Sequence, residues 1–183
     1  MEASRIDSDI FCIKDFMSAE ECKKWIAFSE DHGYEWATVN MGFRQQVVNK
    51  SIRNNKRVIY DSQELARDLW QKIKPYVVRE TPYALACGLN ERFRFYKYKQ
   101  GQEFRPHRDG SFVRNSKERS AYTLLIYLNE NMEGGATEFP KHLIHPITGT
   151  AIIFKHEIRH AGLPIIKGTK YVLRTDIMYR DKL

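Results

Sequence analysis

Apolar and polar positions along the chain follow a helical period in the first half and an extended period in the second. Ser18 and Glu21 have the spacing of a helix capping box and precede an amphipathic stretch, which predicts a helix ending near Gly33. A second serine–glutamate signal lies at residues 61–64. Apolar residues recur after it at helical spacing and predict a second helix with one buried face; they are Leu65, Leu69, Trp70, Ile73 and Val77.

From residue 91 onward the apolar period changes to two, which is typical of strands. The predicted strands cover residues 92–98, 121–128, 150–154 and 170–178. Glycine-containing turn signals separate these strands, and residues 34–60, between the helices, have the pattern of short strands and loops. Two helices followed by many short strands predict an α+β fold in which the helices buttress a sandwich or barrel.

Length and composition indicate one soluble domain over 1–183, with helical support and outer strands in 1–90 and the core in 91–180. Apolar runs of membrane-spanning length are absent from the sequence. The first ten residues contain acids where a signal peptide needs basic and then apolar residues. We therefore expect a cytoplasmic protein, with a nuclear location also open. Its three widely spaced cysteines are expected to be reduced thiols.

The net charge of +7 permits nucleic-acid binding, but basic residues are scattered among acids along the sequence. This pattern favours an ordinary basic surface, and next an anionic substrate attracted by the positive charge. Nucleic acid and membrane are not expected partners. The sequence gives no indication of the oligomeric state.

Two histidines and one aspartate have a spacing that suits a metal centre. His107 and Asp109 are two apart, so on a strand both would project from the same face, and His160 would come from a second strand folded alongside. Two imidazoles and a carboxylate can occupy one face of an octahedral Fe(II) ion and leave the opposite positions open. The remaining histidines are expected to be structural or surface residues; they are His32, His142, His145 and His156.

Two other motifs in the same region are misleading. Residues 156–160 fit the H-E-x-x-H pattern of zinc proteases, which works only on a helix. Here an apolar strand precedes the pattern, and Gly162 and Pro164 follow it, so a helix is not expected. Residues 107–109 read H-R-D, as in a kinase catalytic loop, but the asparagine that should follow is replaced by Arg114.

Five segments follow one another in an order that is typical of a known family; they are Tyr98–Asp109, Thr123–Asn129, Gly134–Phe139, Pro146–Phe154 and His160–Lys170. Together they resemble the prolyl 4-hydroxylases, a family of Fe(II)- and 2-oxoglutarate-dependent dioxygenases. The resemblance covers residues 90 to 180 and implies a double-stranded β-helix, or jelly-roll, core.

The resemblance implies Fe(II), 2-oxoglutarate and O2 as the cofactor set, with ascorbate as an optional reductant. It assigns the metal to His107, Asp109 and His160, the distal carboxylate of 2-oxoglutarate to Lys170, and further cosubstrate contacts to Tyr98 and Tyr127. Period two supports the role of Lys170, because it places Lys170, Val172, Arg174 and Asp176 on one face, where a buried lysine needs an anion. The presence of the carboxylate also favours hydroxylation over halogenation, since related halogenases lack it. Arg174 can pair with Asp176, touch the cosubstrate or hold the substrate.

The substrate is less well specified. The last strand of prolyl hydroxylases often carries a tryptophan lining the pocket, whereas residues 173–179 contain none, and Ala136 replaces a common glutamate. Strand alternation places Arg92, Arg94 and Tyr96 on the same face as Tyr98. These arginines would hold a substrate carboxylate or phosphate, or else form an internal salt bridge to Glu91, Glu103 or Asp176. Residues 110–119 are polar and predict a lid ordered by substrate.

We therefore expect a hydroxylase that oxidises an unactivated C–H bond of a protein side chain, or of a free amino acid or other small anion, with release of succinate and CO2. One alternative is a nucleic-acid demethylase of the alkylation-repair type. That branch usually has two arginines six apart on the last strand, where this chain has Lys170 and Asp176. The other alternative is a binding module on the same fold with an inactive site.

Overall fold

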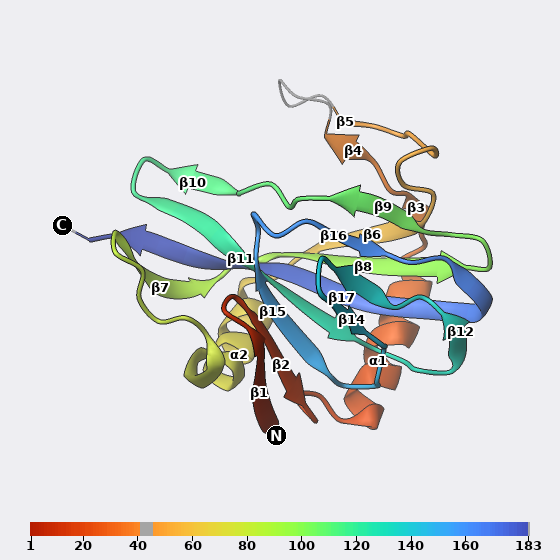
Figure 1. The fold of residues 1–183 in the computed structure, drawn as a ribbon, viewed down its shortest axis with the longest axis horizontal. Coiled ribbons are helices and arrows are strands. Elements are labelled where there is room, and N and C mark those ends of the chain that lie inside the picture. The colour runs from red at the N-terminus through yellow and green to blue at the C-terminus, as the bar shows by residue number, and fades with distance from the viewer. Residues whose placement is uncertain (41–45, 183) are drawn as a thin grey trace.

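A large antiparallel sheet forms the framework of the computed structural model, which describes residues 1–40 and 46–182 (Figure 1). Within those residues the sheet has eleven strands, of which eight follow the order β1-β2-β15-β11-β17-β8-β6-β3, while β10 adds to β11 and β7 and β12 add to β17. The strands are β1 (Glu2–Asp7), β2 (Ile10–Lys14), β3 (Glu35–Trp36), β6 (Lys56–Asp61), β7 (Ala84–Leu89), β8 (Arg92–Lys99), β10 (Val113–Asn115), β11 (Glu118–Tyr127), β12 (Met132–Gly134), β15 (Ala151–Lys155) and β17 (Ile165–Asp181).

A smaller sheet lies across one face of the large one, and in the described residues it has four strands in the order β14-β13-β16-β9 (Figure 1). Its strands are β9 (Phe104–His107), β13 (Thr137–Phe139), β14 (His142–Ile144) and β16 (His160–Gly162). A hairpin of β4 (Val39–Asn40) and β5 (Gln46–Val47) projects beyond the two sheets. Residues 41–45, part of the segment expected to be short strands and loops, lie outside the described residues.

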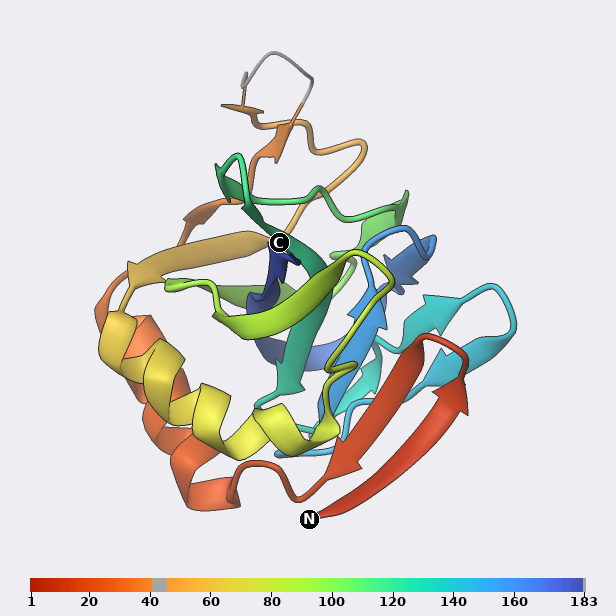
Figure 2. The ribbon, with the colours of Figure 1, turned by 90° about the vertical axis from the view of Figure 1, so that its left-hand side faces the viewer.

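Both predicted helices are confirmed and pack together on the opposite face of the large sheet (Figure 2). Helix α1 (Ala19–Asp31) begins with the predicted capping box between Ser18 and Glu21. Helix α2 (Gln63–Ile73) is capped by Ser62 and continues as a short 3-10 helix, η1 (Lys74–Tyr76). The expected extension of α2 to Val77 is wrong, because Pro75 has no amide hydrogen to donate to a further helical turn.

Two apolar clusters form the core, one on each face of the large sheet. The first joins the helices to the sheet and includes Ile73, Phe95 and Leu173. The second lies between the two sheets and includes Tyr96 and Val172, the immediate neighbours of Phe95 and Leu173. Period two along β8 and β17 therefore separates a helix-packing face from a face that looks into the space between the sheets.

The predicted α+β class is confirmed, and the four predicted strands correspond to β8, β11, β15 and β17. The structure adds the N-terminal hairpin β1–β2, which joins the large sheet through β15. Gly149, just before β15, has φ +76°, and a Cβ there would lie 1.9 Å from the Met17 carbonyl oxygen. This close contact fixes the start of α1 against the sheet.

Two of the cysteines, Cys12 and Cys22, are buried and Cys87 is partly buried, and all three are free thiols as expected. In the described part of the chain, none of the helices has both the length and the apolar character needed to cross a membrane.

Candidate metal centre and adjoining pocket

His107, Asp109 and His160 come together in a pocket of about 500 Å³ that is lined by residues of both sheets. Their candidate ligand atoms all lie within 4.8 Å of one another, and across residues 1–40 and 46–182 no second cluster of this kind is found. His107 ends β9 and lies directly opposite His160 on β16, as the sequence predicts. The two imidazole rings have their centroids 4.3 Å apart.

The predicted position of Asp109 on the same strand as His107 is wrong, because β9 ends at His107 and Asp109 lies in the loop that follows. Two hydrogen bonds orient it instead. Its backbone amide donates to the carbonyl of His156 (3.1 Å), and its Oδ2 accepts from the hydroxyl of Thr123 (2.6 Å). The carboxylate is thereby directed at both histidines, with its oxygens 3.7 Å from each Nε2.

Both histidines have the hydrogen bonds that a metal ligand needs on its second nitrogen. Nδ1 of His107 lies 2.8 Å from the Arg105 carbonyl, and Nδ1 of His160 lies 3.0 Å from the Ile158 carbonyl. A carbonyl only accepts, so each Nδ1 carries the proton and each Nε2 keeps its lone pair. Phe104 stacks on His107 with a centroid distance of 3.5 Å and holds that ring in place.

The protonation states also suit a metal centre. Burial lowers the pKa of His107 to about 3, aided by the neighbouring His160 and opposed by Asp109. Burial likewise lowers the pKa of His160. For Asp109, burial alone would raise the pKa, but Arg174 and the two histidines outweigh it and hold the pKa well below its usual range. Near pH 7 the site therefore offers two neutral imidazoles and one carboxylate, the forms that bind a metal.

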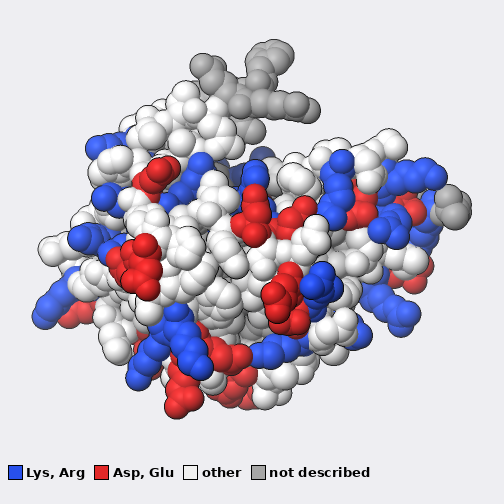
Figure 3. All heavy atoms as spheres, turned by 180° about the vertical axis from the view of Figure 1, so that it is seen from behind, with Lys and Arg blue, Asp and Glu red and all other residues white. Residues whose placement is uncertain are grey.

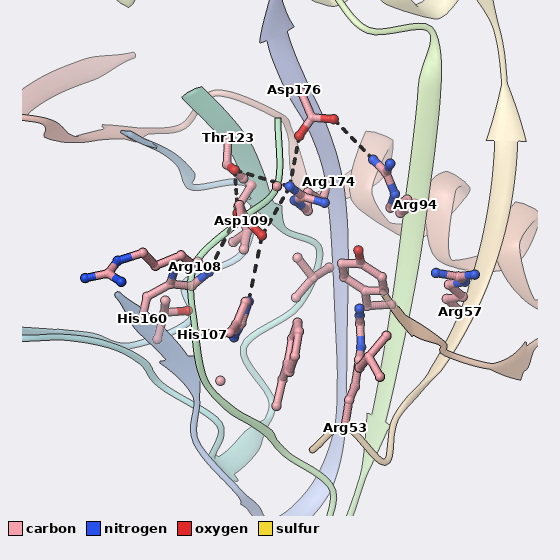
Figure 4. A pocket seen from close by; sticks show the side chains of 18 of the residues that line it. Arg53, Arg57, Arg94, His107, Arg108, Asp109, Thr123, His160, Arg174 and Asp176 are labelled. Carbon is pink, nitrogen blue, oxygen red and sulfur yellow. Dashed lines mark hydrogen bonds and ion pairs between the residues drawn. The ribbon is translucent and has the colours of Figure 1, made fainter. Parts of the chain in front are cut away.

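A buried ionic network lies behind the carboxylate (Figure 4). Nη2 of Arg174 is 3.2 Å from Asp109 and 2.9 Å from Asp176, so of the three roles left open for Arg174 the structure shows the pair with Asp176. Arg94 adds a longer contact of 3.3 Å to Asp176. Burial would raise the pKa of Asp176, but these arginines and His156 lower it to about 2.

His156, the first histidine of the H-E-x-x-H pattern, lies outside the cluster of candidate ligands. It is 5% exposed, and its Nε2 is 3.6 Å from Asp176. Residues 156–158 form a turn and a bend, and β16 begins at His160, so this pattern has no helix to bring its two histidines onto one face.

Lys170 lies in the same pocket as the three candidate ligands and is 4% exposed. Its Nζ donates to the Gly135 carbonyl at 2.5 Å and lies over the rings of Tyr98 and Tyr127, at 5.6 and 5.2 Å from their centroids. Within the described residues no carboxylate forms an ion pair with it, and burial lowers its pKa to about 7. A buried ammonium among aromatic rings, with a single carbonyl partner, suits an anionic ligand.

The hydroxyl of Tyr127 donates to Thr137 at 2.6 Å, beside Lys170. Gly135 keeps this end of the pocket open, because a Cβ there would lie 2.4 Å from the Ile165 side chain and 3.3 Å from that of Lys170. The predicted cosubstrate residues Tyr98, Tyr127 and Lys170 are thus brought together, whereas Arg174, four residues further along β17, lies about 13 Å away along the strand.

The predicted substrate residues have partners of their own. Arg92 makes a two-bond ion pair with Asp61, both at 2.9 Å. Arg94 forms one of the internal salt bridges considered from the sequence, that with Asp176, and its role toward substrate stays a prediction. Tyr96 lines the pocket.

The sequence did not point to several other residues of the pocket. Thr123 and Thr137 follow the alternation of β11 and β13, which could have identified them. Arg53 and Arg57 also line the pocket, but Arg53 lies in a loop, where no periodic pattern exists to reveal it.

Two histidines and one carboxylate are the donor set of non-haem iron(II) oxygenases. Residues 93–175, a little less than half of the chain, match the sequence family described as the 2OG-Fe(II) oxygenase superfamily. No curated protein sequence is significantly similar to the chain. The family and the two-histidine, one-carboxylate donor set together imply Fe(II) and 2-oxoglutarate, and the chain is accordingly an enzyme.

Solved structures of prolyl hydroxylases share the fold over nearly the full chain. A viral collagen prolyl hydroxylase from Paramecium bursaria Chlorella virus-1, solved with 2OG, is 22% identical with a TM-score of 0.66, covering 94% of this chain and 97% of that one. A Pseudomonas putida prolyl-4-hydroxylase is 17% identical with a TM-score of 0.67, covering 96% and 94%. A Trichoplax adhaerens prolyl hydroxylase, solved with a hypoxia inducible factor peptide fragment, is 18% identical with a TM-score of 0.69, covering 92% and 83%. These TM-scores and coverages show a common fold, the jelly roll expected from the sequence.

Proposed function

We propose that this enzyme is a hydroxylase that inserts oxygen into an unactivated C–H bond of a peptide side chain, or of a free amino acid or other small anion. The main observation in support of this proposal is that one pocket holds the His107–Asp109–His160 cluster and also the buried Lys170, which has no acidic partner among the described residues. The chemistry of these groups matches a ferrous ion on one side and a dicarboxylate on the other. The similarity in fold to prolyl hydroxylases supports a prolyl or prolyl-like substrate.

The chain's own residues would bind and orient the reactants. His107, Asp109 and His160 would hold Fe(II), and Lys170 would pair with the distal carboxylate of 2-oxoglutarate, with Tyr98 and Tyr127 alongside. Once bound, iron and 2-oxoglutarate supply oxygen insertion from O2, with succinate and CO2 as products. Arg174 keeps Asp109 ionised through their 3.2 Å contact. Ascorbate would serve as an auxiliary reductant, and the cytoplasmic location stays a prediction.

Metal binding and cosubstrate turnover can be tested without knowing the substrate. Purified protein is titrated with Fe(II) under nitrogen, and succinate formed from 2-oxoglutarate in air is then measured. His107→Ala and His160→Ala are expected to lose both iron and succinate formation, because each removes one of three ligands. His156→Ala is the matched control and should keep both, since its ring lies against Asp176. Loss of iron in His156→Ala with retention in His160→Ala would contradict the assignment.

The reaction type requires a second measurement. Peptide libraries and cell extract are incubated with the loaded enzyme and analysed by mass spectrometry. Addition of one oxygen atom to a peptide or small molecule supports hydroxylation. Loss of methyl groups from added methylated oligonucleotides, without oxygen addition to the other pools, would instead indicate a demethylase.

A further inference from the structure

The wall of the pocket facing the metal ligands carries positive charge that the protein does not neutralise. Among the described residues lining the pocket, two are acidic, Asp109 and Asp176, and both are engaged by Arg174. Bound Fe(II) and 2-oxoglutarate carry opposite charges of equal size, so they leave this balance unchanged. The arginines that line the pocket are Arg53, Arg57, Arg92, Arg94, Arg108 and Arg174.

Arg53 is the most unusual of these arginines. It is 5% exposed, and its guanidinium lies between the rings of Tyr96 and Phe104, with centroid distances of 4.2 and 4.3 Å. Its Nε donates to Asn55 at 2.6 Å, but its buried Nη2 has no hydrogen-bond partner among the described residues. An unsatisfied cationic donor inside a pocket is unfavourable unless a ligand supplies the acceptor.

Arg57, on β6, lies on the same wall (Figure 4). It donates to two neutral oxygens, those of Thr38 (2.7 Å) and Gln46 (3.1 Å), and within residues 1–40 and 46–182 it has no ion pair. Burial lowers the pKa of Arg57. Tyr96 opposes this effect, and the like charges of Arg53 and Arg94 add smaller lowering effects. Three guanidinium groups therefore share one wall, and one of them, Arg94, has a carboxylate partner, at 3.3 Å.

The pKa of Tyr96 reflects the positive charge at this wall. Its burial alone would raise the pKa of the phenol, but Arg53, Arg174 and Arg94 outweigh burial and lower the pKa to about 8. The environment therefore favours a negative charge at the place where the Tyr96 hydroxyl enters the pocket.

We propose that Arg53 and Arg57 form a substrate subsite that binds a carboxylate close to the C–H bond to be oxidised, an inference that rests on the proposed function. A guanidinium that lies between two rings directs its N–H donors along its in-plane edge, which suits a planar carboxylate. The carboxylate comes either from an acidic peptide or from a free amino acid. Arg92, an earlier candidate from the sequence, is engaged by Asp61 and is not part of this subsite.

The distribution of charge on the surface bears on which anion the pocket binds. On the face shown in Figure 3, basic and acidic side chains are interspersed, without a continuous basic patch. A local anion is therefore the favoured ligand, and a nucleic-acid backbone is an outcome for the test to exclude.

The test uses protein loaded with Zn(II), which prevents turnover, and with saturating 2-oxoglutarate, which occupies the site at Lys170. Each of the twenty free amino acids is compared with its carboxamide. Tetrapeptide pools with capped ends compare glutamate with glutamine at one fixed position. Ligands that co-elute with the protein are quantified by mass spectrometry. We expect at least one carboxylate pool to be retained about tenfold more than its amide partner, because a charge-assisted bidentate contact is lost in the amide. A preference among the free amino acids identifies an amino acid as the source of the carboxylate, and a preference among the tetrapeptide pools identifies an acidic peptide.

Variants locate the preference. Arg57→Gln and Arg53→Lys are each expected to reduce it to about twofold or less, whereas Arg67→Gln, which changes an exposed arginine of α2 outside the pocket, should leave it unchanged. Melting temperatures and calorimetric affinity for 2-oxoglutarate verify that each variant is folded and loaded. The proposal is overturned if acids and amides are retained equally, or if neither is retained. Stronger retention of a phosphoserine pool or an oligonucleotide, or loss of 2-oxoglutarate affinity in Arg57→Gln, also overturns it. Failure of the proposed function would appear separately, as absent iron-dependent succinate formation.

Discussion

Replacing Lys170 by methionine is expected to stabilise the cosubstrate-free protein while removing its affinity for 2-oxoglutarate. Burial lowers the pKa of Lys170 from its ordinary 10.5 to about 7. Each pKa unit corresponds to about 1.4 kcal/mol, so the buried ammonium destabilises the folded state by up to about 5 kcal/mol. Methionine has a similar length and no charge. After allowing about 1 kcal/mol for the lost hydrogen bond to Gly135, we expect a gain of about 2 to 4 kcal/mol at pH 7.

The pH dependence gives this prediction its sign. The unfolded lysine binds a proton up to about pH 10.5, while the folded one releases it above about pH 7, so the unfolded state holds more protons in between. Wild-type stability contributed by this group therefore rises as pH increases from 7 to 10.5. The advantage of Lys170→Met should be fully present at pH 7 and approach zero near pH 10.

Urea unfolding followed by tryptophan fluorescence, at pH 7 and pH 10 without cosubstrate, measures both effects. Lys167→Met, an exposed lysine on the same strand, is the control and should change stability by less than about 0.5 kcal/mol. Calorimetry should show 2-oxoglutarate binding weakened about 30- to 1000-fold in Lys170→Met, the loss of one buried charge-assisted contact. A variant no more stable than wild type at pH 7, or one that keeps its advantage at pH 10, would refute the reasoning.

Four further outcomes are expected. Arg174→Met should lower the free energy of unfolding by about 3 kcal/mol in urea titrations, because it leaves buried carboxylates unpaired; a change below about 1 kcal/mol would contradict the buried network. Gly149→Ala should destabilise by about 2 to 4 kcal/mol in the same titration, since its Cβ would meet a backbone oxygen at 1.9 Å. Arg94→Ala should lower substrate turnover far more than uncoupled succinate formation, and equal losses would make it structural. The segment Gly110–Arg119, which contains β10, should gain hydrogen-exchange protection only when substrate is added, and protection by 2-oxoglutarate alone would argue against a lid.

Local sequence signals predicted much of the fold because they act within one element. The capping box at Ser18 fixes the start of α1, and period two identifies β8 and β17 and places Lys170 on the inner face. The hairpin β1–β2 has no such signal, because its place is decided by pairing with β15, some 140 residues away along the chain. The spacing of residues within a segment does not predict non-local pairing of this kind.

The metal cluster was predictable for a chemical reason, and its surroundings were not. His107 and His160 can be assigned to one metal site from their motifs, because few other functions require histidines in such an arrangement. The position of Asp109 beyond the end of β9 depends on hydrogen bonds to His156 and Thr123, which no spacing rule contains. The stacked position of Arg53 between two rings is likewise a product of tertiary packing.

Strand β17 has a consequence for how such an enzyme can diversify. It spans Ile165–Asp181 and carries both Lys170 and the arginine behind Asp109. In the proposed function, one continuous backbone would therefore set the length available to the cosubstrate. A one-residue insertion there would turn every inward side chain outward, and a two-residue insertion would move the anchor by about 7 Å. The wall formed by Arg53 and Arg57 belongs to other segments of the chain. If that wall binds the substrate as proposed, substitutions in it would change which molecule is oxidised while the spacing of the metal ligands and Lys170 stays the same.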